Sequence, residues 1–302
     1  MKNKTVIFVV GPTAVGKTAL AVEVALHFNC EIISADSRQF YREISIGTAK
    51  PTAAEMREVP HHFIDNLSIV DPYSAGQFEI EAEAKLRQLF THKDLVVVVG
   101  GSGLFINALA FGLDDIPSTP QEIRAALNQE CEEKGLPAMV EKLLAIDPEY
   151  AQSVDVKNKH RVLRGLEVFE TASTRLSDLQ KRKPKTKDFN AIWIGLDLPR
   201  ATLYQRINQR VDLMLSQGLL EEVELLRPYS HLSPLKTVGY QEFYLPDLTV
   251  ETAVECVKRN SRRYAKRQLT WFRKNQRVTW FSPQEKEKIF QLITDQIDER
   301  TH

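Results

Sequence analysis

Short apolar runs alternate along this chain with longer stretches in which apolar residues recur every three or four positions. The runs that predict strands lie at residues 6–10, 31–35, 95–99 and 191–196. The stretches with helical spacing lie at residues 19–28, 75–90, 200–215 and 254–274. Runs rich in Val and Ile are typical of parallel strands that are buried on both faces. The alternation therefore predicts an α/β fold with a mostly parallel sheet.

The pattern changes after the Pro117–Pro120 break. From residue 121 to about residue 179 the chain is poor in strand signals, and its apolar residues keep helical spacing. Pro137 and the pair Asp147-Pro148 are expected to separate the helices. We therefore predict a small all-helical insertion domain at residues 119–190, set within a discontinuous core domain at residues 1–118 and 191–302.

The first predicted strand runs directly into the sequence GPTAVGKT, which has the phosphate-loop spacing G-x-x-x-x-G-K-[ST]. Its residues are Gly11, Pro12, Thr13, Ala14, Val15, Gly16, Lys17 and Thr18. The glycines let successive N–H groups point inward, and the following helix and Lys17 add positive charge. The Thr18 hydroxyl is placed to bind a Mg²⁺ ion that the phosphates carry in. We therefore expect a core like that of P-loop nucleoside triphosphatases, which binds a phosphate chain at residues 11–18.

Asp36 follows the second predicted strand, at the edge of the sheet where ligands bind in open α/β folds. It could cap a following helix, or it could be an acid held beside the phosphate loop. The strand at residues 95–99 ends in Gly100-Gly101, where a nucleoside triphosphatase often has a magnesium-binding Asp. The chemistry therefore need not be ATP hydrolysis, and the phosphate loop alone does not establish whether ATP binds.

Charge is balanced over the whole chain, with 40 basic and 40 acidic residues, but it is uneven along it. No acidic residue occurs from Val257 to Gln284. The basic residues of the helix in this region fall on two adjacent rows, made up of Lys258, Arg259, Arg262, Arg263, Lys266 and Arg267. Such a stripe, with aromatic residues between its members, predicts contact with a polyanion, although a solvated cationic face is the alternative.

Composition limits the setting in which the protein works. Its three cysteines, Cys30, Cys131 and Cys256, lie far apart, which argues against a disulfide framework or a zinc site. No apolar run is long enough to span a membrane, and the N-terminus lacks a signal peptide. We therefore expect a cytoplasmic protein.

Three functions are compatible with these residues. A phosphate loop, a neighbouring acid and a basic helix favour a transferase that acts on nucleic acid. A small-molecule P-loop kinase would also use the loop and the acid, but it does not need the basic helix. A non-catalytic, nucleotide-gated RNA-binding module would not need the acid.

Eight motifs in order make the chain similar to the bacterial tRNA dimethylallyltransferases, also called tRNA isopentenyltransferases or the IPP transferase family. In chain order they are GPTAVGKT at 11–18, ADSRQFY at 35–41, IGTAKP at 46–51, VGGSGLF at 99–105, HRVLRGLEVF at 160–169, QRVDLMLSQGLLEEV at 209–223, VGYQEF at 238–243 and KRQLTWFR at 266–273. The resemblance covers nearly the whole chain. The chain departs from the usual pattern at Ser102, where Thr is common, at Phe105, where Tyr is common, and at His160 and Gln241, where the residue varies or is more basic elsewhere.

This resemblance implies transfer of a dimethylallyl group from dimethylallyl diphosphate to the exocyclic amine of the tRNA adenosine just 3′ of the anticodon. By analogy Asp36 is the general base, and Lys17, Thr18 and Arg210 hold the diphosphate together with Mg²⁺. The residues expected to face tRNA are Asp36, Ser37, Arg38, Gln39, Ser102, Arg124, His160, Arg161, Val162, Leu163, Arg164 and the segment 236–241. The enzyme is expected to act as a monomer with no membrane partner.

Overall fold

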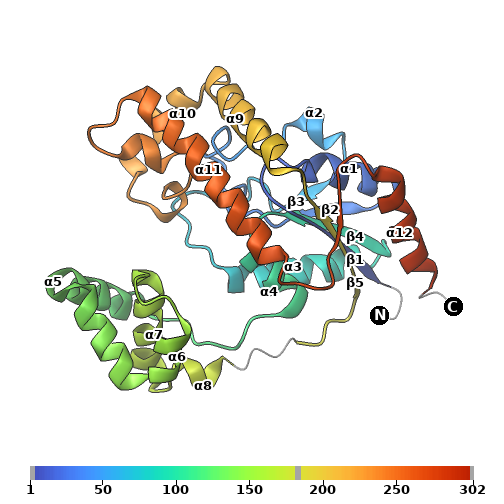
Figure 1. Ribbon diagram of the computed structural model, residues 1–302. Coiled ribbons are helices and arrows are strands. Elements are labelled where there is room, and N and C mark those ends of the chain that lie inside the picture. The colour runs from blue at the N-terminus through green and yellow to red at the C-terminus, as the bar shows by residue number, and fades with distance from the viewer. Residues whose placement is uncertain (1–3, 181–184, 300–302) are drawn as a thin grey trace. The chain divides into compact units, whose positions relative to one another are not determined.

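The computed structural model describes residues 4–180 and 185–299 and contains a six-stranded sheet in which every neighbouring pair is parallel (Figure 1). The strand order is β3-β2-β4-β1-β5-β6. The strands are β1 (Thr5–Val10), β2 (Glu31–Ser34), β3 (His61–His62), β4 (Leu95–Gly100), β5 (Asn190–Leu196) and β6 (Thr279–Phe281). The predicted α/β class and phosphate-loop fold are thus confirmed, and the four strands expected from apolar runs form the middle of the sheet.

Strand β1 lies between β4 and β5, with Val6 aligned with Val96 on one side and with Ala191 on the other. All six of its residues are buried. Phe8 packs into the core on one face of the sheet, and Ile7 packs into the core on the opposite face. A strand with both faces covered needs apolar residues at every position, which explains why its sequence does not alternate.

Helices cover both faces of the sheet. The helices of this unit are α1 (Lys17–His27), α2 (Ala53–Met56), α3 (Ala75–Leu89), α4 (Gly103–Phe111), α9 (Arg200–Ser216), α10 (Leu219–Leu226), α11 (Val250–Phe272) and α12 (Lys286–Asp298). Short 3₁₀ turns lie at Arg227–Tyr229, Ser233–Leu235 and Gln241–Tyr244. Residues of α3 and α4 belong to one core, and residues of α1 and α12 belong to the other.

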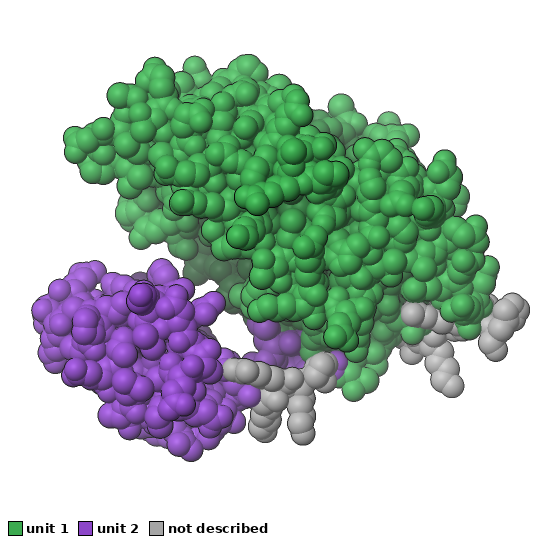
Figure 2. Space-filling model, viewed as in Figure 1, with its two compact units in different colours: residues 1–111, 186–302 green, residues 112–185 purple. Residues whose placement is uncertain are grey.

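The chain divides into two compact units, which Figure 2 colours separately. Unit 1 comprises residues 1–111 and 186–302, and unit 2 comprises residues 112–185. The sequence had placed these boundaries several residues later, after 118 and after 190. Unit 2 consists of α5 (Gln121–Ile146), α6 (Pro148–Ser153), α7 (Lys159–Ala172) and α8 (Leu176–Leu179), which enclose a core of their own.

The break expected at Pro137 lies two residues earlier. Gly135 has φ 80° and ψ 160°, so α5 is two helical segments joined at this glycine. Pro137 then occupies the first turn of the second segment, where its missing N–H costs no hydrogen bond. No helix in residues 4–180 and 185–299 combines the length and the apolar character needed to cross a membrane.

Candidate active site

The phosphate loop joins the buried end of β1 to the start of α1. Gly11 has φ 144°, and a Cβ atom there would lie 2.6 Å from the carbonyl oxygen of Leu196 in β5. Gly16 has φ 112° and forms the N-cap of α1. Both positions therefore require glycine, and the N-terminus of α1 is left open toward an anion.

Two cations lie at the loop. The Lys17 amine donates a hydrogen bond of 2.7 Å to the carbonyl oxygen of Pro12, and burial lowers its pKa to about 8. Arg210 of α9 donates a hydrogen bond of 3.3 Å to the Thr13 hydroxyl, and burial lowers the pKa of Arg210 as well. Burying cations is costly, so a phosphate group bound beside them at this loop would be strongly favoured.

Asp36 lies beside these cations, at the C-terminal end of β2. No helix begins after it; residues 37–40 form a turn, so the helix-capping alternative is wrong. One Asp36 carboxylate oxygen accepts a hydrogen bond of 3.1 Å from the backbone N–H of Arg38. The N–H of Ser37 donates to the Ser102 hydroxyl at 3.0 Å. The serine found at position 102 thus keeps a hydroxyl that holds the turn next to Asp36.

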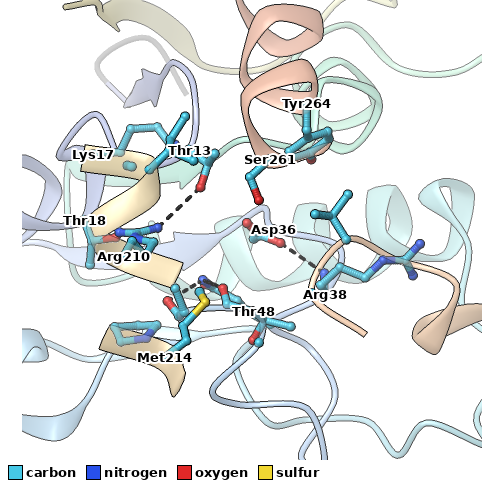
Figure 3. A pocket seen from close by; sticks show the side chains of 18 of the residues that line it. Thr13, Lys17, Thr18, Asp36, Arg38, Thr48, Arg210, Met214, Ser261 and Tyr264 are labelled. Atoms are coloured by element: carbon cyan, nitrogen blue, oxygen red, sulfur yellow. Dashed lines mark hydrogen bonds between the residues drawn. The ribbon is translucent and has the colours of Figure 1, made fainter. Parts of the chain in front are cut away.

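A cavity of about 480 Å³ contains both sets of groups. Figure 3 shows Thr13, Lys17, Thr18 and Arg210 on one side and Asp36 on the other. Apolar side chains of α9 and α11 also line the cavity, namely Ile207, Val211, Met214 and Val257. The cavity can therefore hold a molecule with an anionic end and a short apolar end, in contact with a carboxylate.

Tyr264 of α11 also lines this cavity (Figure 3). Burial, together with the charge of Asp36, raises its pKa to about 12. The phenol therefore stays protonated at neutral pH and can donate a hydrogen bond beside Asp36.

The glycines after β4 are explained by close packing. A Cβ atom on Gly100 would lie 2.4 Å from the carbonyl oxygen of Ala35, and one on Gly101 would lie 2.2 Å from the amide nitrogen of Gln268. Gln268 is 5% exposed; it accepts a hydrogen bond of 2.8 Å from the N–H of Thr13 and donates one of 2.9 Å to the carbonyl oxygen of Gly101. This residue of α11 joins the phosphate loop to the segment after β4, and the sequence did not single it out.

Glu222 of α10 is a second residue that sequence analysis missed. Its carboxylate accepts hydrogen bonds from the N–H groups of Ser45, Ile46 and Gly47 at 2.9–3.0 Å and from the Tyr240 hydroxyl at 2.5 Å. These groups belong to the IGTAKP and VGYQEF motifs or adjoin them, and both motifs contribute residues to the cavity wall. Glu222 therefore holds one side of the cavity in place.

The basic stripe on α11 is divided between two environments. Lys258 forms an ion pair of 2.8 Å with Asp212 of α9, and Arg262 donates a hydrogen bond of 2.7 Å to Asn208. These two side chains are therefore held by α9, so only the other members of the predicted stripe remain for contact with a polyanion. The remaining four basic residues are exposed, namely Arg259, Arg263, Lys266 and Arg267.

The candidate RNA-binding residues of unit 2 also differ in environment. Val162 and Leu163 are 0% and 3% exposed within the core of this unit, so the prediction that they contact tRNA through their side chains is wrong. Arg164 donates a hydrogen bond of 2.9 Å to the Thr119 hydroxyl, and Arg124 forms an ion pair of 3.4 Å with Glu167. His160 and Arg161 are exposed on α7.

Comparisons with known proteins agree on one family. The sequence matches the IPP transferase family over residues 39–275. It is 48% identical over 295 residues to the tRNA dimethylallyltransferase of Christiangramia forsetii, covering 96% of this chain and 97% of that protein. It is 46% identical over 302 residues to the corresponding protein of Cytophaga hutchinsonii, covering 98% and 99%.

Solved structures give the same result. The crystal structure of a tRNA isopentenylpyrophosphate transferase from Bacillus halodurans matches with a TM-score of 0.73 and 37% identity, over 99% of this chain and 98% of that one. A eukaryotic dimethylallyltransferase, described as acting on tRNA, matches with a TM-score of 0.76 and 28% identity, over 89% of this chain and 70% of that one.

Proposed function

The chain belongs to the IPP transferase family, and from this premise we propose that it transfers a dimethylallyl group from dimethylallyl diphosphate to the N6 amine of the adenosine 3′-adjacent to the anticodon of tRNA. Family membership makes it a tRNA-modifying prenyl transferase. The observation that supports the detailed reaction is the cavity that holds Lys17, Arg210 and Asp36 together beside an apolar wall.

The phosphate-loop side of the cavity suits the donor. Diphosphate gains negative charge as its bond to the dimethylallyl carbon breaks, and cations fixed around it stabilise that charge. The backbone N–H groups of residues 14–18, together with Lys17 and Arg210, would hold the diphosphate. The apolar side chains on α9 and α11, including Met214, would contact the five-carbon chain.

Asp36 suits the acceptor. The amine of adenine is a poor nucleophile, so a carboxylate that takes its proton as the new N–C bond forms lowers the barrier. In this step the C–O bond to diphosphate breaks, the N–C bond forms and the proton passes to Asp36. The adenosine has to leave its stack to reach this carboxylate, which is easier in an anticodon loop than in a duplex.

The cavity also fits a Mg²⁺ ion, provided that the diphosphate supplies part of its coordination. Thr18 and Asp36 both line the cavity and offer a hydroxyl and a carboxylate oxygen, which are the hard ligands that Mg²⁺ takes. Within residues 4–180 and 185–299 no group of three or more His, Cys, Asp or Glu side chains could hold a metal alone. When bound, the ion would offset charge on the departing diphosphate.

The remaining predicted contacts are assigned to tRNA. Ser37, Arg38, Gln39 and Ser102 adjoin Asp36 in unit 1, and Arg124, His160, Arg161 and Arg164 belong to unit 2. We further propose that the enzyme works as a monomer and, because its acceptor is tRNA, that it acts in the cytoplasm.

The direct test incubates the protein with unmodified tRNA and Mg²⁺, and with dimethylallyl diphosphate, ATP or no donor. The tRNA is then digested and its nucleosides are identified by mass spectrometry. We expect a prenylated adenosine only with dimethylallyl diphosphate, and a loss of product when EDTA removes the metal. An unmodified tRNA in the first reaction would contradict the proposal, and ATP consumption with added small molecules would favour a kinase.

A further inference from the structure

Trp271 is an exposed tryptophan at the C-terminal end of α11, and nothing in the proposed reaction uses it. Trp271 is 42% exposed, whereas Trp193 in the sheet is 3% exposed. A partly exposed tryptophan presents a large aromatic face on which a partner molecule can stack. Its surroundings indicate what that partner is.

The indole ring is held in place by a glycine. A Cβ atom on Gly103 would lie 2.3 Å from Cδ1 and Nε1 of Trp271, so the indole lies directly against the backbone at the start of α4. Any other residue at 103 would displace the ring. Beside Gly103, Leu104 is 50% exposed. One part of the ring is therefore fixed against the protein, while the rest is open to solvent next to another apolar side chain.

The same side of α11 carries positive charge and leads to the cavity. Arg267 lies one turn before Trp271, and its guanidinium is 5.6 Å from the ring centre of Tyr264. Tyr264 lines the cavity that contains Asp36. Residues 264, 267 and 271 lie at helical spacing, so they share one side of the helix over about 10 Å. A ligand with one end in the cavity could thus extend along α11 and reach Trp271 with its other end.

These cations remain available to a ligand. Among the residues that the structure describes, Arg263, Arg267 and Lys274 form no ion pair, in contrast to Lys258, which is paired with Asp212. An exposed aromatic ring with free cations beside it matches unpaired nucleic acid, whose bases stack on aromatic rings and whose phosphates contact Arg and Lys. A protein partner would not require this surplus of positive charge.

We propose that Trp271 is a stacking platform for an unpaired base of the tRNA anticodon loop near the acceptor adenosine, and that Arg267 contacts the connecting phosphates. This proposal rests on the proposed function, because it takes the adenosine at Asp36 as the starting point. In this arrangement the acceptor adenine lies unstacked in the cavity, and α11 binds the nucleotides next to it.

The test measures the affinity of full-length protein for an unmodified anticodon stem-loop RNA. Trp271→Ala is expected to weaken binding about tenfold, within the range for loss of one base–aromatic stack, whereas Trp271→Phe keeps most of the affinity. Tyr229→Ala is the matched control, because Tyr229 is 45% exposed on a 3₁₀ turn that does not line the cavity, and it should bind as wild type does. Inorganic diphosphate should bind all variants equally.

A second measurement does not depend on how well Trp271→Ala folds. The stem-loop should quench tryptophan fluorescence of the wild type, and Trp271→Phe should lose that quenching. Wild-type RNA affinity in Trp271→Ala, or unchanged quenching in Trp271→Phe, would overturn the platform even if prenyl transfer is confirmed. If prenyl transfer fails while Trp271→Ala still loses RNA affinity, the platform stands and the proposed reaction does not.

Discussion

The Gln268 side-chain oxygen accepts a hydrogen bond of 2.8 Å from the backbone N–H of Thr13, although 255 positions separate the two residues in the sequence. The other end of the same amide donates to Gly101, next to Ser102, whose hydroxyl accepts from the N–H of Ser37. One buried side chain therefore connects the loop that would hold the donor with the turn that carries Asp36.

Gln268→Glu should lower kcat by about 10²-fold, because a carboxylate cannot donate to the Gly101 carbonyl and the two loops would shift relative to each other. Steady-state kinetics with both substrates gives kcat and each KM. Gln276→Glu makes the same charge change at an exposed position after α11 and should have wild-type kinetics. An unchanged kcat in Gln268→Glu would show that the amide has no positioning role.

Asp36→Asn should keep tRNA affinity but lose about 10²–10⁴-fold in kcat, since an amide cannot take the proton from the attacking amine. Binding and single-turnover prenylation should be measured on the same preparation. Asp247→Asn, at an exposed position, is the control for removal of a carboxylate. Wild-type turnover in Asp36→Asn would remove the general-base role.

The Lys17 amine should give the reaction a pH dependence on the alkaline side. Its pKa is lowered to about 8 by burial, so in the free enzyme the amine is charged below pH 8 and loses its charge as the pH rises through that value. The kcat/KM for dimethylallyl diphosphate should therefore fall above about pH 8. Bound diphosphate favours the charged amine, so kcat should keep its plateau to higher pH.

Lys17→Arg separates this effect from other titrations, because a guanidinium stays charged throughout the range. If the variant retains measurable activity, its kcat/KM profile should lack the fall near pH 8. A fall of the same shape in Lys17→Arg would assign it to another group.

Salt dependence should distinguish the two rows of α11. Arg267→Gln should make the plot of log affinity for tRNA against log salt concentration less steep, by about the amount that one phosphate contact contributes. Lys258→Gln should leave that slope unchanged, since Lys258 is already paired with Asp212. Equal slopes in both variants and in wild type would mean that this side of α11 does not contact RNA phosphates.

The sequence predicted those features that depend on local pattern. The apolar runs identified the four middle strands because strands buried on both faces need apolar residues throughout. The phosphate loop was recognisable because Gly11 and Gly16 are required by backbone geometry. In contrast, β3 and β6 have two and three residues, which is too short to give a pattern.

The contacts of Gln268 and Glu222 could not be predicted in this way, because their partners lie on segments distant in sequence. The basic stripe was overestimated for a related reason. Spacing shows which residues share a side of a helix, but it does not show that Lys258 and Arg262 face α9. Likewise, Val162 and Leu163 were grouped with their basic neighbours although their side chains form the core of unit 2.

Because unit 1 is discontinuous in sequence, its fold cannot be completed until late in synthesis on the ribosome. The phosphate loop is among the first segments to be made. However, β5, which pairs with the second edge of β1, begins only at Asn190, after all of unit 2. Arg210 and Gln268, which contact Thr13, are made later still. A nascent chain therefore exposes one edge of its central strand until unit 2 has been synthesised, and a prematurely terminated chain carries a phosphate loop without its partners.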